Sequence, residues 1–113
     1  MQKKKNFSAE DQKLAAFARV LSHPARIAIL RYLAECGVCI SGDISNEIPL
    51  SRTTVSQHLQ ELKEAGLIKG EIEGVKMNYC IDGEALRFMQ QQLTDFFQTI
   101  HHNTNFTCKS KES

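Results

Sequence analysis

The segment from Ser51 to Gly66 separates apolar from polar positions with the period of an α-helix. At about 100° of rotation per residue, apolar side chains gather on one side and hydrogen-bonding side chains on the other. The apolar side holds Val55, Leu59 and Leu62, and the polar side holds Thr53, Gln57 and Gln60. Ser51 is a favourable N-cap and Gly66 a favourable end, so the pattern predicts one amphipathic helix between them.

The segments on either side of this helix predict a helix-turn-helix followed by a hairpin. Residues 42–48 read as a short helix, which Pro49 ends just before the cap of the next one. Downstream, residues 67–72 and 75–81 alternate between apolar and polar side chains around a turn that contains Gly74. We therefore expect a two-stranded β-hairpin directly after the amphipathic helix.

The polar face of the 51–66 helix has the chemistry of a surface that reads DNA. Hydroxyl and carboxamide groups bond to base edges or phosphate oxygens, and glutamine bonds to adenine at two positions. The first ten residues of the segment contain Arg52 and no acidic residue, whereas Glu61 and Glu64 lie in the later turns. A recognition helix that enters the groove end-on presents its early turns. The alternative is an ordinary surface helix whose exposed positions are polar.

Amphipathic helices are also predicted at both ends of the fold. A capping-box-like start at Ser8 precedes one of them, and Asp82 or Gly83 opens the other. The apolar stripe of the second helix is wider than one neighbour within the chain requires, so we expect both helices to form a homodimer interface. The expected interface residues are Leu14, Phe17, Leu21, Leu86, Met89, Leu93, Phe96, Phe97 and Ile100. The alternative is that the two helices only cover the domain core.

Several linked motifs occur in order between residues 21 and 81. They are Leu21-Ser22-His23-Pro24-Ala25-Arg26-Ile27-Ala28-Ile29-Leu30, Leu50-Ser51-Arg52-Thr53-Thr54-Val55-Ser56-Gln57-His58-Leu59, Leu62-Lys63-Glu64-Ala65-Gly66-Leu67-Ile68, and Glu73-Gly74 before Tyr79. With these motifs over half of the chain resembles the ArsR-type winged helix-turn-helix repressors of bacteria. The resemblance implies a homodimeric, operator-binding transcriptional repressor without catalytic activity, which leaves DNA when an effector binds or a thiol is modified.

The candidate DNA contacts lie on the early turns of the 51–66 helix, with further residues in support. The contacts are Ser51, Arg52, Thr53, Ser56, Gln57 and Gln60, and the supporting positions are Thr54, His58, Lys63 and Lys76. Lys76 lies near the hairpin tip, where it can reach a phosphate or the minor groove. His58 is nearer the buried flank, so it positions the helix, touches the DNA backbone or packs. Arg26 either holds a phosphate or pairs with an acid, and His23 is expected as a polar group at a helix end.

Composition agrees with a small regulator, although the charge is low for a DNA-binding protein. The 113 residues form one domain, expected over residues 8–102, between a disordered basic start at 1–7 and a flexible polar tail at 103–113. The formal net charge is only +1, so basic groups must be placed locally if they are to contact phosphates. This low charge keeps open an alternative function, a dimeric protein-interaction module of winged-helix fold without specific DNA binding.

Two classes of protein are excluded by missing sequence features. No Gly-rich phosphate loop, nucleophile elbow or HExxH motif is present, so we do not expect an enzyme. No segment approaches the ~18 consecutive apolar residues of a membrane span, so we expect a cytoplasmic protein without a membrane partner. Cysteines are reduced in the cytoplasm, and a disulfide scaffold is therefore not expected.

The cysteines Cys36, Cys39, Cys80 and Cys108 are the candidate metal or thiol-switch residues. Metal-responsive members of the resembled family carry a Cys-x-Cys pair before the helix-turn-helix, but here the run is Cys39-Ile40-Ser41, and a hydroxyl is a poor ligand for soft metals. A thiolate-bound metal or metalloid effector is thus a candidate without a complete ligand set. The competing hypothesis is oxidation or persulfidation of the thiols, and the simplest alternative is that they fill space.

The sequence as a whole predicts an α+β, mainly helical fold. It is a winged helix-turn-helix with a two-stranded β-hairpin wing and N- and C-terminal dimerisation helices. The predicted function is that of a sequence-specific transcriptional regulator, a homodimeric repressor of a near-palindromic double-stranded DNA operator. A metal, a metalloid or a thiol-redox signal is expected to release it from DNA.

Overall fold

The computed structural model describes residues 7–42, 44–72 and 77–103. Its elements are α1 (Ala9–Val20), α2 (Pro24–Cys36), β1 (Ile40–Ser41), α3 (Arg52–Glu64), β2 (Ile68–Glu71), β3 (Asn78–Ile81) and α4 (Gly83–Asn103). This order confirms the mainly helical α+β winged fold. The last helix reaches Asn103, one residue into the segment expected as a tail.

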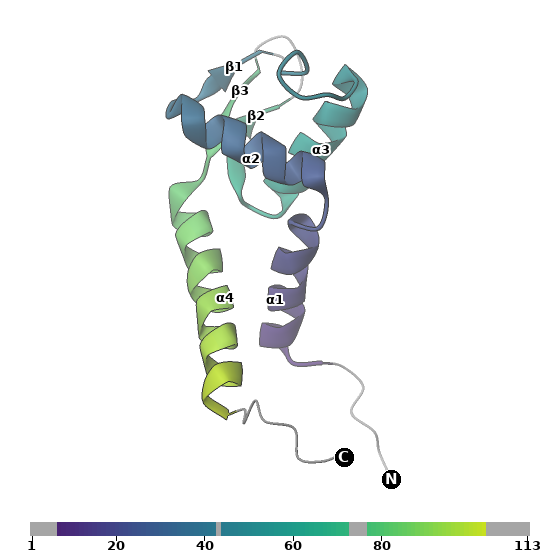
Figure 1. Cartoon of the computed structure of the whole chain (residues 1–113). Coiled ribbons are helices and arrows are strands. Elements are labelled where there is room, and N and C mark those ends of the chain that lie inside the picture. Colours follow the sequence, from purple (N-terminus) through teal and green to yellow (C-terminus); the bar gives the residue numbers. More distant parts are fainter. Residues whose placement is uncertain (1–6, 43, 73–76, 104–113) are drawn as a thin grey trace.

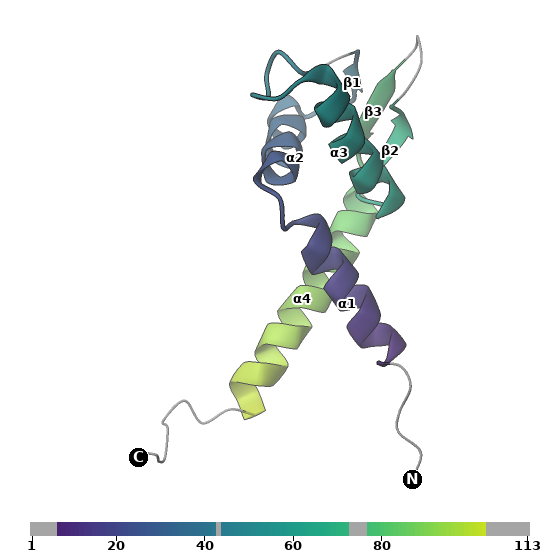
Figure 2. The ribbon, with the colours of Figure 1, turned by 90° about the vertical axis from the view of Figure 1, so that its right-hand side faces the viewer.

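The elements form two parts, which we call the head and the stalk (Figures 1 and 2). The head contains α2, α3 and the sheet, and the stalk contains α1 and α4, which contact each other and project away from the sheet. The rings of Phe17 on α1 and Phe88 on α4 meet edge to face, with their centroids 6.2 Å apart. The ammonium nitrogen of Lys13 lies 4.8 Å from the centroid of the same Phe88 ring.

The sheet has three antiparallel strands in the order β1-β3-β2. The hairpin of β2 and β3 follows the predicted alternation, because Ile68 and Tyr79 are buried while Lys69 and Asn78 are exposed. Strand β1 extends the two-stranded wing of the prediction. It has only two residues, too few for a periodic pattern to reveal it.

Close pairing of β2 and β3 depends on Gly70. Its φ is +111°, and a Cβ atom at this position would overlap the backbone of Asn78 on the opposite strand. Only glycine combines this backbone conformation with the absence of a side chain. Gly70 therefore allows β2 and β3 to pair closely, directly after the end of α3.

The core of the head lies between α2, α3 and the sheet. The predicted apolar seam of α3 is confirmed, with Val55 and Leu59 each 1% exposed and Leu62 fully buried. Ile29 and Leu33 of α2 pack in the same cluster, together with residues of the sheet. Burial of the seam leaves the opposite side of α3 facing outward.

The short helix predicted at residues 42–48 is not formed, and the structure has a series of turns at residues 45–49 instead. Gly42 has a φ of +88°, and Pro49 disfavours the helical conformation of the residue before it. Ile44 and Ile48 are nevertheless buried, at 3% and 4% exposure. The segment thus covers the core as a helix would, and it leads directly into α3.

Candidate nucleic-acid interface

The first turn of α3 is held by a hydroxyl cap. Ser51 is the N-cap, and its Oγ accepts a hydrogen bond of 3.2 Å from the backbone nitrogen of Thr54. The same hydroxyl donates to Oγ1 of Thr54 over 2.9 Å. Both side chains are therefore engaged in fixing the start of the helix, where free backbone N–H groups attract anions.

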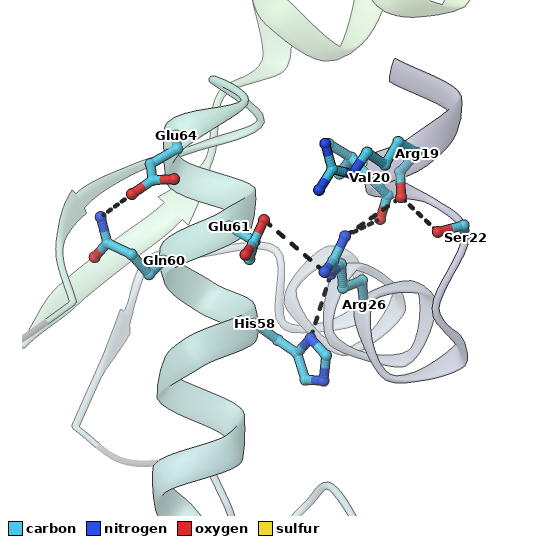
Figure 3. Close-up of polar contacts among 8 residues, drawn as sticks. All are labelled: Arg19, Val20, Ser22, Arg26, His58, Gln60, Glu61 and Glu64. Atoms are coloured by element: carbon cyan, nitrogen blue, oxygen red, sulfur yellow. Dashed lines mark hydrogen bonds and ion pairs between the residues drawn. The ribbon is translucent and has the colours of Figure 1, made fainter. Parts of the chain in front are cut away.

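The outward side of α3 carries the predicted polar residues. Arg52, Thr53 and Gln57 are exposed, and Ser56 and Gln60 are half-buried at the edges of the same face. The amide nitrogen of Gln60 donates to Glu64 over 3.1 Å (Figure 3), so this side chain is already oriented along the helix. Arg52, Thr53 and Gln57 therefore offer the most accessible hydrogen-bonding groups of the face.

Acidic side chains on α3 are confined to its later turns, which suits a helix whose first turns face DNA. Its first turn contains no acidic residue, so the partial positive charge of the helix N-terminus is not neutralised there. The carboxylates of Glu61 and Glu64 lie more than two turns further along the helix. A phosphate or a base edge would thus meet favourable potential at the early turns.

His58 is turned toward the core, with 8% of its surface exposed. Its Nδ1 accepts a hydrogen bond of 3.3 Å from Nε of Arg26 (Figure 3). The centroid of its ring lies 4.4 Å from that of His23. Burial and the neighbouring His23 and Arg26 lower the pKa of His58, and Glu61 opposes this shift. Of the three roles expected for His58, this geometry favours positioning of the helix and packing over contact with the DNA backbone.

Arg26 and His23 occupy two of the roles considered from the sequence. Arg26 lies 3.9 Å from the carboxylate of Glu61, so it pairs with an acid. His23 is the N-cap of α2, and its Nδ1 accepts from the backbone nitrogen of Ala25 over 3.0 Å. Sequence reasoning did not reveal that one arginine joins three helices, because the partners lie far apart along the chain.

The remaining supporting positions flank this face. Lys63 is half-buried in the last turn of α3, and Lys69 is exposed on the adjacent strand β2. Lys76, expected at the wing tip, lies outside the described residues. The described part of the wing therefore offers one exposed lysine, together with exposed Glu71 on the same strand.

Large apolar side chains remain exposed along α4. Leu86, Phe88, Phe96, Phe97 and Ile100 have exposed fractions between 36% and 57%. Folded monomers rarely expose contiguous apolar surface of this kind. Phe17 and Met89, expected at a dimer interface, are instead 8% and 4% exposed within the chain's own core. Phe88 faces α1, where its ring meets that of Phe17. The surface we call the α4 apolar face therefore excludes these three residues and comprises Leu86, Leu93, Phe96, Phe97 and Ile100.

Two of the candidate cysteines form a pair. Cys39, directly before β1, is bonded to Cys80 of β3 in a disulfide, contrary to the expectation that the cysteines are reduced. The strand register brings the two together, because the next residue, Ile40, lies opposite Tyr79. Cys36 has a free thiol, and its hydrogen bond with Tyr32 raises the pKa of that phenol. Cys108 lies outside the described residues.

Over the described ranges, no group of three or more His, Cys, Asp or Glu side chains is arranged to hold a metal ion. The same ranges contain no helix with the length and apolar character that crossing a membrane requires. The sequence did not predict this disulfide. Cys39 and Cys80 are 41 residues apart, and strand β1, whose pairing with β3 brings them together, is too short to predict.

The chain is similar to known helix-turn-helix proteins. Residues 21–71 match a family described as a helix-turn-helix domain. The chain is 31% identical over 78 residues to the HTH-type transcriptional regulator YgaV of Escherichia coli (strain K12), a match that covers 69% of this chain and 79% of that protein. It is 29% identical over 102 residues to the arsenical resistance operon repressor of Staphylococcus xylosus, covering 90% and 94% of the two chains. For some other curated relatives the match spans 59% of the relative's length.

A solved structure supports the fold independently. The homodimeric winged helix-turn-helix DNA-binding domain of Mb0332 from Mycobacterium bovis, described as a possible ArsR-family regulator, aligns with a TM-score of 0.58. The two share 24% identity, and the alignment covers 95% of this chain and all of that one. The relatives are named transcriptional regulators and the fold is a winged helix-turn-helix, so the chain is a winged helix-turn-helix transcriptional regulator rather than an enzyme. More narrowly, the chain belongs to the ArsR-type family of these regulators.

Proposed function

We propose that the protein is a homodimeric repressor that binds a near-palindromic DNA operator through the outward face of α3. The observation that carries this proposal is the exposure of Arg52, Thr53 and Gln57 on a helix whose opposite side is buried. Hydrogen-bonding side chains on the early turns of such a helix can reach base edges in the major groove. Ser56 and Gln60 flank this contact, and Ser51 and Thr54 hold the start of the helix near the phosphates. A cytoplasmic location follows as part of the same proposal.

The α4 apolar face supports the homodimer. A second copy of the chain would cover the exposed rings of Phe96 and Phe97, which lie 5.3 Å apart between centroids. The structurally similar Mb0332 domain is described as homodimeric. Two-fold symmetry would present two α3 helices to half-sites about one helical turn apart, which explains why the operator should be near-palindromic.

Substitution of Gln57 tests the reading face. Gln57→Ala should weaken binding to the preferred duplex by ~1 to 3 kcal/mol and leave binding to random duplex nearly unchanged, because glutamine bonds specifically to base edges. Fluorescence anisotropy on both duplexes at one salt concentration measures the difference. Gln98→Ala, the same change at an exposed position of α4, is the matched control and should bind as the wild type does. Equal losses on both duplexes would remove Gln57 from base recognition and favour the protein-interaction module.

The Cys39–Cys80 pair supports a thiol-redox signal over a metal signal. In the reducing cytoplasm the pair would be a dithiol, and an oxidising low-molecular-weight disulfide would convert it. In that exchange one thiolate attacks the reagent and the second displaces it, so that the S–S bond forms and the reagent leaves as two thiols. The bond joins the segment that enters the helix-turn-helix to the central strand of the wing. Oxidation would therefore limit how far α3 can move relative to the wing when both bind DNA.

Oxidation is accordingly expected to lower operator affinity by about tenfold, a shift of the size that allosteric coupling commonly gives. Anisotropy of the reduced and the oxidised protein on the same duplex measures this ratio, and mass spectrometry identifies the bond formed. Cys39→Ser should bind equally under both conditions, whereas Cys36→Ser should keep the response. Equal affinity of the reduced and oxidised wild type would rule out this signal.

A further inference from the structure

The side chain of Arg26, which belongs to α2, contacts both α1 and α3 (Figure 3). Its NH1 group lies 3.3 Å from the backbone carbonyl oxygens of both Arg19 and Val20, in the last turn of α1. Its Nε donates to Nδ1 of His58 over 3.3 Å, and NH2 lies 3.9 Å from the carboxylate of Glu61 on α3. Arg26 itself belongs to the first turn of α2. No other side chain in Figure 3 joins α1, α2 and α3.

At α1, the guanidinium occupies the end of the helix. The carbonyls of the last turn lack partners within a helix, and a positive charge is favourable at this end of the helix dipole. The carbonyl oxygen of Arg19 also accepts from the backbone nitrogen of Ser22 over 3.1 Å and from its Oγ over 2.7 Å, so Ser22 and Arg26 hold it together. The rigid fork of arginine can bond two helices in defined directions, which the point charge of lysine cannot do.

At α3, the bond from Arg26 fixes the protonation of His58. Arginine can only donate, so Nδ1 of His58 must carry a lone pair and the ring must be neutral. The charged and titratable groups around this ring are His23 and Arg26 of α2 and Glu61 of α3, while α1 contributes backbone carbonyls. Protonation would place an N–H and a positive charge against the guanidinium, and would break the bond.

We propose that Arg26 is a positioning residue that couples the end of stalk helix α1 to recognition helix α3, and that this coupling requires neutral His58. The inference rests on the proposed role of α3 in reading DNA. His58 and Glu61 directly follow Gln57 and Gln60 in the chain, so a contact at the inner side of α3 fixes the rotation of its outer side. Since α1 belongs to the stalk, the same contact would transmit the arrangement of the dimer to the DNA-reading face.

The pH dependence has a defined sign. Because the pKa of His58 in the folded chain lies below its ordinary value, the unfolded chain binds this proton more readily. The contribution of His58 to folding stability is therefore greatest above the ordinary pKa of histidine, about 6.5. It decreases as the pH falls from there toward the lower pKa that His58 has in the folded chain. Preference for operator over random duplex should decrease over the same range.

The first test compares the operator preference of three proteins between about pH 7.5 and pH 5.5, the range in which histidine titrates. The wild type should lose roughly tenfold in preference, a change of the size that coupling between two sites commonly gives. His58→Asn should show a flat profile, because the amide oxygen can replace Nδ1 as an acceptor but does not titrate. His102→Asn is the matched control, since it makes the same change at an exposed position of α4, and it should keep the wild-type decrease.

The second test is a double-mutant cycle between Arg26→Gln and His58→Ala, with operator affinity and unfolding free energy as separate readouts. Coupled residues should give a double variant whose loss of affinity is smaller than the sum of the single losses. Arg31→Gln removes the same charge from an exposed position of α2 and should have little effect. If Arg26→Gln does not fold, the pH profile of His58→Asn still tests whether the coupling requires neutral His58.

Failure of this inference is distinct from failure of the proposed function. A wild type that prefers operator at neutral pH, but whose decrease at low pH persists in His58→Asn, would overturn the coupling while leaving DNA recognition intact. Additive losses in the cycle would do the same. A wild type without any operator preference at neutral pH would instead overturn the proposed function.

Discussion

Phe97→Glu should convert the protein to a monomer that binds operator about 100-fold more weakly. Phe97 is the most exposed residue of the α4 apolar face, at 57%, and a carboxylate there would lose its hydration in the interface without gaining a partner. A monomer engages one half-site at a time and loses the high effective concentration that links the two sites. Sedimentation equilibrium measures the mass, and anisotropy on the full operator measures the affinity.

Gln98→Glu is the control for this experiment, because it introduces the same charge at the neighbouring exposed position of α4. It should remain dimeric and bind operator as the wild type does. Circular dichroism should report the same helix content for both variants, since the core of each chain is unchanged. A Phe97→Glu variant that remained dimeric at micromolar concentration would place the interface elsewhere on the molecule.

Loss of the Cys39–Cys80 bond should have the second large effect, a decrease of about 2 to 4 kcal/mol in unfolding free energy. The bond closes a loop across a separation of 41 residues, and an unfolded chain without it gains the entropy of that loop. Urea denaturation of oxidised wild type and of Cys39→Ser, at equal protein concentration because dimers are stabilised by association, measures the difference.

Cys36→Ser is the matched substitution, because Cys36 has a free thiol. Under oxidising conditions it should unfold near the wild-type midpoint. Under full reduction the wild type and Cys39→Ser should converge. If oxidised wild type were no more stable than Cys39→Ser, Cys39 and Cys80 would not be linked in solution.

The parts of the fold that were predicted correctly are those in which local sequence and burial agree. The seam of Val55, Leu59 and Leu62 identified α3, because three apolar residues at helical spacing must face the core. The cap at Ser51 was recognisable for the same local reason. The candidate DNA contacts follow from that helix, since the side opposite a buried seam faces outward.

The features that were missed depend on contacts between distant segments. Strand β1 forms only because β3 offers it an edge, and its pairing in turn brings Cys39 to Cys80. Arg26 and His58 are separated by 32 residues, and nothing in their local sequence states that their side chains meet. The turns at residues 45–49 show the opposite case, in which Pro49 outweighs a helix-like spacing of apolar residues.

Sequence-specific binding by α3 in a dimer can be measured by selecting bound duplexes from a random pool with the reduced wild-type protein and sequencing them. Recognition by two α3 helices should enrich a near-palindromic motif whose half-sites are about 10 to 10.5 base pairs apart, centre to centre. Binding that is weak and equal across the pool, with no motif enriched, would exclude an operator-binding dimer and leave a winged-helix interaction module.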